Sequence, residues 1–172
     1  MNRVLDKRLK ELATLLTNMR RLHERLHETV RAKLEAVRRA DTEAIHEAGR
    51  EEGRLAESIK SQEGLRRLLM DKVGGELGVP PAKARKLTIG ELAASVAEPA
   101  RSQLTVLGAD IRKLASEIAR VNRINALVSH EMLKHFRHVY ETMTQGTTPR
   151  NVYGCTGRPQ RGAPVAMIDT TG

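Results

Sequence analysis

Histidines and one cysteine are the residues of this chain best suited to metal binding or catalysis. His23 and His27 lie four residues apart, and His135 and His138 lie three apart. Two imidazoles at these spacings can hold a metal ion on one helix. Neither pair has a carboxylate or cysteine in a recognised ligand pattern, and His135 falls on an apolar stripe. We therefore predict core or surface histidines, with no metal site and no cofactor.

Cysteine chemistry is equally unsupported. Cys155 is the single cysteine, and it lies between Gly154 and Gly157 in a Gly/Pro-rich tail. A nucleophilic cysteine needs a base and an oxyanion site on ordered structure. A lone cysteine also excludes an intramolecular disulfide, so the chain carries no mark of an oxidising compartment. The glycines of VGGELG (73–78) lack the lysine of a phosphate-binding loop. With no catalytic constellation, we predict a protein without enzymatic activity.

The composition predicts helices as the elements that position these residues. Of 172 residues, 40% are hydrophobic and 30% charged, but only Phe136, Tyr140 and Tyr153 are aromatic. A sheet-based or compact enzyme core depends on several rings, each burying about 150–250 Å². Leu/Ala/Arg/Glu/Lys-rich chains are typical of long helices and coiled coils. The predicted fold is all-α: an elongated antiparallel helical bundle or coiled coil of long helices, with one short helix and a flexible C-terminal tail.

A heptad pattern predicts the first helix, from Leu5 to about Ala40. Its seam alternates spacings of four and three: Leu5, Leu9, Leu12, Leu16, Met19, His23, Leu26 and Val30. Further leucines widen this apolar face, so the helix should pack on two neighbours. Asp41 is a good N-cap for a second helix, which predicts a helical hairpin there. One long bent helix through residue 40 is the alternative.

Local signals divide the rest of the chain. The second helix carries apolar residues from Ile45 to Val73, and the glycines and prolines of residues 74–81 end it. The T-x-x-E capping box that begins at Thr88 predicts a short helix through about Ala97. Pro99 suits the first position of the last helix. The helical domain is predicted to span residues 1–145, followed by a Gly/Pro-rich tail at 146–172.

The last helix has the cleanest seam in the chain. Its members are Leu104, Leu107, Ile111, Leu114, Ile118, Val121, Asn125, Val128, Met132, His135 and Val139. A core asparagine such as Asn125 commonly fixes register or oligomeric state, and a binding role is equally open. The larger apolar side chains at the end of this helix, Met132, Phe136, Val139, Tyr140 and Met143, either cover the end of the bundle or form a groove for a partner helix.

The charge distribution favours an internal helix pair. The chain has a net charge of +9. Residues 1–40 hold 11 basic and 5 acidic residues, whereas residues 41–78 hold 6 basic and 9 acidic, which suits antiparallel neighbours. There is no lysine tract and no aromatic interleaving of the kind that stacks bases, so we predict no nucleic-acid partner. No segment approaches the ~18 apolar residues of a membrane span, so we predict no membrane insertion.

The order of these elements resembles the FlgN-type flagellar export chaperones. The resemblance runs from about Leu5 to Gly157, and covers the leucine heptads, the acid-rich second helix and the Gly/Pro linker. Its most specific parts are NRINALV, with Asn122 and Asn125, and the YGCTG of the tail at Tyr153. Residues 158–172 have no counterpart in the family pattern.

This resemblance implies a cytoplasmic type III secretion chaperone without enzymatic activity. Its partners would be the C-terminal amphipathic helix of the hook-filament junction proteins and the cytosolic domain of the flagellar export gate. The substrate helix would meet Asn125, Val128, Met132, Phe136, Val139 and Met143, and the gate would meet Val152, Tyr153 and Gly154. Two alternatives stay open: a basic coiled coil that binds nucleic acid, and a structural protein that forms homo-oligomers.

Overall fold

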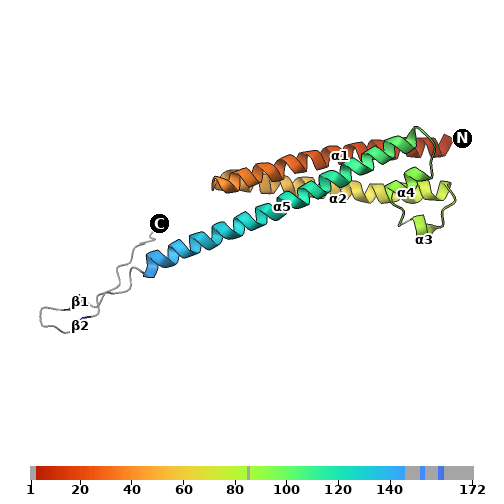
Figure 1. The fold of residues 1–172 in the computed structure, drawn as a ribbon. Coiled ribbons are helices and arrows are strands. Elements are labelled where there is room, and N and C mark those ends of the chain that lie inside the picture. Colours follow the sequence, from red (N-terminus) through yellow and green to blue (C-terminus); the bar gives the residue numbers. More distant parts are fainter. Residues whose placement is uncertain (1–2, 85, 146–151, 154–158, 161–172) are drawn as a thin grey trace. The chain divides into compact units, whose positions relative to one another are not determined.

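The chain folds as an all-α helical bundle, as the composition predicts. The computed structural model describes residues 3–84, 86–145, 152–153 and 159–160. The elements are α1 (Arg3–Arg38), α2 (Thr42–Glu76), α3 (Pro81–Ala84), α4 (Ile89–Ala94), α5 (Ala100–Gln145), β1 (Val152–Tyr153) and β2 (Pro159–Gln160) (Figure 1). They form two compact units, Met1–Ala126 and Leu127–Gly172, so α5 begins in the first and ends in the second.

A hairpin joins α1 and α2, which lie side by side in Figure 1. Ala40 takes a left-handed conformation with φ of 53°, and this reverses the chain within two residues of the end of α1. Asp41 then caps α2, because its carboxylate accepts the backbone N–H of Ala44 at 3.0 Å. The predicted hairpin and cap are confirmed, and the alternative of one long bent helix is wrong.

Ion pairs between α1 and α2 confirm that opposite charges face each other. Arg25 reaches Glu51 at 2.7 Å, and Lys33 reaches Glu52 at 2.7 Å. Toward the other end, Arg8 lies 3.5 Å from Glu76. The start of α1 thus meets the end of α2, and the second half of α1 meets the first part of α2, so the two helices are antiparallel. Part of the positive charge of α1 is therefore neutralised inside the bundle.

The connection from α2 to α5 holds two short helices, of which only one was predicted. Gly74 lies inside the last turn of α2, and a Cβ there would come within 2.9 Å of the Ala84 Cβ. It is therefore a packing position for α3. The prediction that residues 74–81 end the second helix is confirmed, since α2 ends at Glu76, whereas α3 was not predicted. Gly78, with φ of 73°, makes the turn that follows.

The capping box at the start of α4 is confirmed. The Thr88 hydroxyl accepts the Glu91 backbone N–H at 3.2 Å, and the Glu91 carboxylate accepts the Thr88 N–H at 2.7 Å. The helix is shorter than predicted and ends at Ala94. The last helix begins at Ala100, one residue later than predicted, and the Pro99 carbonyl accepts the Gln103 N–H at 3.3 Å.

Helix α5 packs along α1 in the first unit, so α1 has the two neighbours that its wide apolar face predicts. Arg20 lies 3.2 Å from Asp110, and His27 lies 3.7 Å from Glu117. Residue numbers rise together on both helices, which gives an up-down-up order for α1, α2 and α5. The largest fully buried side chains among the described residues of this unit are Leu12, Leu16, Val30, Val73, Leu92 and Leu104.

Candidate functional site

The heptad seam of α5 changes from buried to exposed along its length. Leu104, Leu107, Ile118, Val121 and Asn125 are buried in the first unit. After Asn125, Val128 and Met132 are only half-buried. Val139 is 40% exposed, although it continues the same spacing. The apolar pattern of this helix therefore runs beyond the residues that a core encloses.

Five apolar side chains of α5 in the second unit form a continuous surface, which we call the C-terminal stripe. Its members are Val128, Met132, Phe136, Val139 and Met143. At 3.6 residues per turn they fall within about 80° of the helix circumference, and they extend along about 22 Å of its axis. Phe136 is 57% exposed and Met143 60% exposed. A monomeric helix rarely leaves so long an apolar stripe open to water without a partner.

The start of the C-terminal stripe borders a shallow apolar depression. Leu127, Val128, Met132 and Phe136 line it together with Glu131 and His135. The rings of His135 and Phe136 lie with their centroids 6.4 Å apart. The ion pair between Glu131 and Lys134 is long, at 4.0 Å, and both side chains are well exposed. The surface is thus apolar at its centre and charged only at its margin, which suits an amphipathic partner.

Asn125 shares the face of the C-terminal stripe but lies in the first unit, away from solvent. Its side chain is 5% exposed, and Nδ2 donates to the Val30 carbonyl at 3.0 Å. This hydrogen bond fixes the position of Asn125 on α5 opposite Val30 on α1, and so sets how far the two helices are shifted along each other. Of the two roles open from the sequence, the register role is the one with a contact in the structure.

The residues predicted to bind the export gate lie in or beside β1. Val152 and Tyr153 pair with Gln160 and Pro159 of β2 in an antiparallel ladder. Gly154 and Cys155 lie outside the described residues. The predicted flexibility of the tail also falls mostly on residues that are not described, so it stays a prediction.

The paired histidines lie partly in the core and partly on the surface. His23 is buried, and its Nδ1 lies 2.7 Å from the Met19 carbonyl, a contact in which the ring nitrogen donates. His135 and His138 are exposed on α5. Among the residues that the structure describes, no group of three His, Cys, Asp or Glu side chains is placed to hold a metal ion.

Comparison with models of known protein families shows which family this chain belongs to. The sequence model of the FlgN protein family matches residues 1–161, which includes every described helix and both strands. The chain belongs to the FlgN family. No curated protein and no solved structure matches it.

FlgN membership makes this chain a flagellar export chaperone, a class of protein that binds flagellar substrate proteins. In the described part of the chain, no helix is long and apolar enough to cross a membrane. The predicted family and the predicted chaperone class are thus confirmed.

Two exposed leucines beside the C-terminal stripe were missed by the sequence reasoning. Leu127 is 62% exposed and Leu133 67% exposed. Both lie off the heptad seam, and the seam was the signal that selected candidates. A comparison of helix lengths would have drawn attention to this region, since α5 has 46 residues while α1 and α2 have 36 and 35.

Proposed function

We propose that this FlgN-family chain is a cytoplasmic chaperone for hook-filament junction proteins, whose C-terminal amphipathic helices it binds through the C-terminal stripe. The observation that carries the proposal is the exposure of apolar side chains at helical spacing. Phe136, Val139 and Met143 present 57%, 40% and 60% of their surfaces to solvent. An amphipathic helix with its own apolar face would cover them, as in other helix-in-groove complexes.

The side chains of the stripe suit a chaperone that must release its cargo. Methionine has three rotatable bonds and a polarisable sulfur, so Met132 and Met143 can repack against different apolar faces. Ordering a disordered cargo segment subtracts about 2–5 kcal/mol from the gross interaction energy. The net affinity is thus moderated without any loss of apolar contact.

The second half of the proposal concerns delivery to the export gate. The tail would bind the cytosolic domain of the gate through Val152, Tyr153 and Gly154, as the family resemblance implies. These residues follow α5 in sequence, and none of them belongs to the stripe. One chain could therefore hold its cargo and contact the export machine at the same time.

Calorimetry with the C-terminal helix of the junction protein from the same genome tests the cargo site. We expect Met132→Asp and Phe136→Asp to weaken binding at least tenfold, because each places a carboxylate against an apolar partner face. The matched control is Val106→Asp, since Val106 is also on α5 and 56% exposed but lies in the first unit. Tyr153→Ala should keep cargo affinity and lose binding to the gate domain.

Several outcomes would contradict the proposal. Equal affinity of the stripe variants and the parent would remove the cargo site, and equal gate affinity after Tyr153→Ala would remove the tail assignment. A dimer in sedimentation that Phe136→Asp dissociates would show that the stripe joins two copies instead. Retention of DNA with a steep salt dependence would favour the nucleic-acid alternative.

A further inference from the structure

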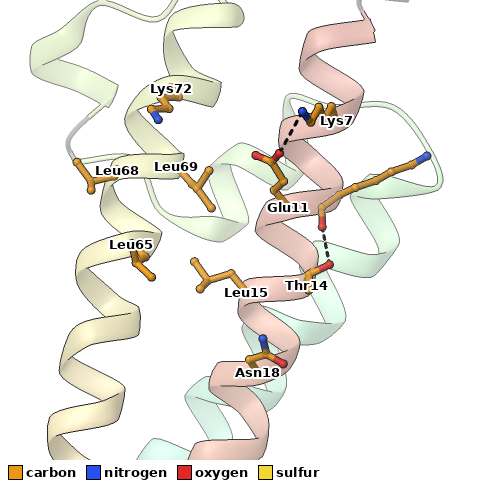
Figure 2. A pocket seen from close by; sticks show the side chains of 10 residues that line it. Lys7, Glu11, Thr14, Leu15, Asn18, Leu65, Leu68, Leu69 and Lys72 are labelled. Carbon is orange, nitrogen blue, oxygen red and sulfur yellow. Dashed lines mark hydrogen bonds and ion pairs between the residues drawn. The ribbon is translucent and has the colours of Figure 1, made fainter.

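A second apolar surface lies between α1 and α2, far in sequence from the C-terminal stripe. Its floor contains Leu15 of α1 with Leu65, Leu68 and Leu69 of α2. Figure 2 shows Leu15 and Leu69 extending into the space between the two helices. Leu65 is 48% exposed and Leu68 59% exposed. We call this surface the α1–α2 groove.

Lysine side chains from both helices line the α1–α2 groove. Lys7, Lys10 and Lys72 line it, and the one carboxylate among its lining residues is that of Glu11. Glu11 lies 4.0 Å from Lys7, and the Lys7 side chain is 79% exposed, so this pair neutralises little of the charge. An adjoining hollow shares Lys7 and Lys72 and adds Arg3 and Arg8, of which Arg8 is paired with Glu76 at 3.5 Å. The rim is therefore positive over an apolar floor.

We propose that the α1–α2 groove binds an acidic amphipathic helix of a partner protein, separately from the cargo site. The floor supplies apolar contact at Leu65, Leu68 and Leu69 of α2, the i, i+3, i+4 spacing at which one helix packs against another. The lysines supply charge complementarity, which selects glutamates or aspartates beside the apolar stripe of the partner.

Charge disfavours the two occupants that this protein itself could provide. Residues 146–172 contain three arginines and one aspartate, so the tail of the chain is repelled by the rim. A second copy carries a net charge of +9, and its residues 127–145 hold two basic and two acidic side chains. Neither the tail nor residues 127–145 of a second copy offers the surplus of carboxylates that the lysines would recognise. The acid-rich α2 of a second copy has such a surplus, but its Glu51, Glu52 and Glu76 already pair with α1 of their own chain.

Two synthetic 18-residue helical peptides test the inference. Both have leucines at i, i+3, i+4 and i+7, and one carries glutamates beside them where the other carries lysines. In fluorescence anisotropy at low salt, we expect the full chain to bind the glutamate peptide at least tenfold more tightly. Added salt should reduce this preference, because the rim is exposed.

Variants of the groove locate the binding. Leu68→Asp should weaken binding of the glutamate peptide at least tenfold, with Val106→Asp as the matched exposed control. The double change Lys10→Glu and Lys72→Glu should reverse the preference, so that the lysine peptide binds better. Phe136→Asp, in the C-terminal stripe, should leave both peptides unaffected. Circular dichroism checks that each variant keeps its helices.

Three results would overturn the inference. One is equal binding of the two peptides by the parent chain, since charge would then select nothing. Another is parental affinity in Leu68→Asp. The third is a parent dimer in sedimentation that Leu68→Asp converts to monomer, which would assign the groove to a second copy. Loss of cargo binding is not among them, because the cargo site uses other residues.

Discussion

Asn125 is held in the core by a single hydrogen bond and leaves one polar atom unsatisfied. Its Nδ2 donates to the Val30 carbonyl, but its buried Oδ1 accepts from none of the residues that the structure describes. A buried acceptor without a partner costs about 1–3 kcal/mol. The Val30 carbonyl already accepts the helical N–H of Leu34, so it does not depend on Asn125. Asn125 therefore helps to fix the register between α5 and α1, but it lowers the free energy of unfolding.

Substitutions at Asn125 should separate register from stability. We expect Asn125→Leu to be neutral or stabilising, within about 1 kcal/mol, because it removes the unsatisfied oxygen and keeps the volume apolar. Asn125→Asp should destabilise by about 3 kcal/mol or more, since it buries a charge beside the Val30 carbonyl oxygen. Urea unfolding followed by circular dichroism at pH 7 measures both. If both variants lost equal stability, Asn125 would have a role beyond its one hydrogen bond.

The seam position of Asn125 was predictable, whereas its partner was not. The four-three spacing places residue 125 in the core without any knowledge of the fold. Its contact with Val30 spans 95 residues, and it depends on how far α5 is shifted along α1. The same limit applies to Leu65 and Leu68, which the sequence shows to be apolar residues of the second helix, but whose exposure depends on how many neighbours α2 has. The spacing of apolar residues indicates which face of a helix is apolar. Which element covers that face follows only from the packing of the helices.

Among the helices, the boundaries that the sequence predicted correctly are those marked by short capping patterns. Asp41 and Thr88 act on backbone N–H groups three residues away, so their roles follow from short sequence patterns. Helix α3 has four residues and no comparable signal, and Gly74 is required by the approach of Ala84 ten residues later. The sequence therefore predicted the capped starts of α2 and α4, but it did not predict α3, which depends on tertiary contact.

The capping box gives α4 a pH dependence with a definite sign. The backbone N–H of Thr88, and then its hydroxyl, lower the pKa of Glu91 below its ordinary value of 4.5. A lowered folded-state pKa means that the unfolded chain binds more protons between the two pKa values. The stabilisation is therefore complete above about pH 4.5 and is lost as the pH falls through the folded-state pKa.

Glu91→Gln tests this dependence, because glutamine retains a capping-box oxygen but does not titrate. We expect the variant to be less stable than the parent at pH 7, and the difference to be smaller at pH 3, because below about pH 4.5 the unfolded parent binds more protons at Glu91 than the folded parent does. Glu98, whose pKa Ser102 lowers, titrates equally in both proteins. Urea unfolding at the two pH values gives the comparison. A difference that grows on acidification would contradict the sign.

For the whole molecule, burial and the proposed cargo binding belong to different parts of the chain. Every buried residue among those described lies between Leu9 and Asn125. The C-terminal stripe begins at Val128, just beyond the division between the two compact units. The heptads predicted a continuous seam along α5 but not where its burial ends, because that depends on the extent of the core. The part of α5 that stabilises the bundle therefore ends before the part that we propose binds the cargo begins.

Truncation after residue 126 tests this separation directly. The fragment 1–126 keeps all the described buried side chains and the ion pairs between α1 and α2. We expect it to unfold within about 4 °C of the full chain, the shift that about 1 kcal/mol produces in a domain of this size. It should lose cargo binding and retain the glutamate peptide in the α1–α2 groove. A fragment that unfolds far below the full chain would show that residues beyond 126 hold the bundle together, and the stripe would then have a structural role.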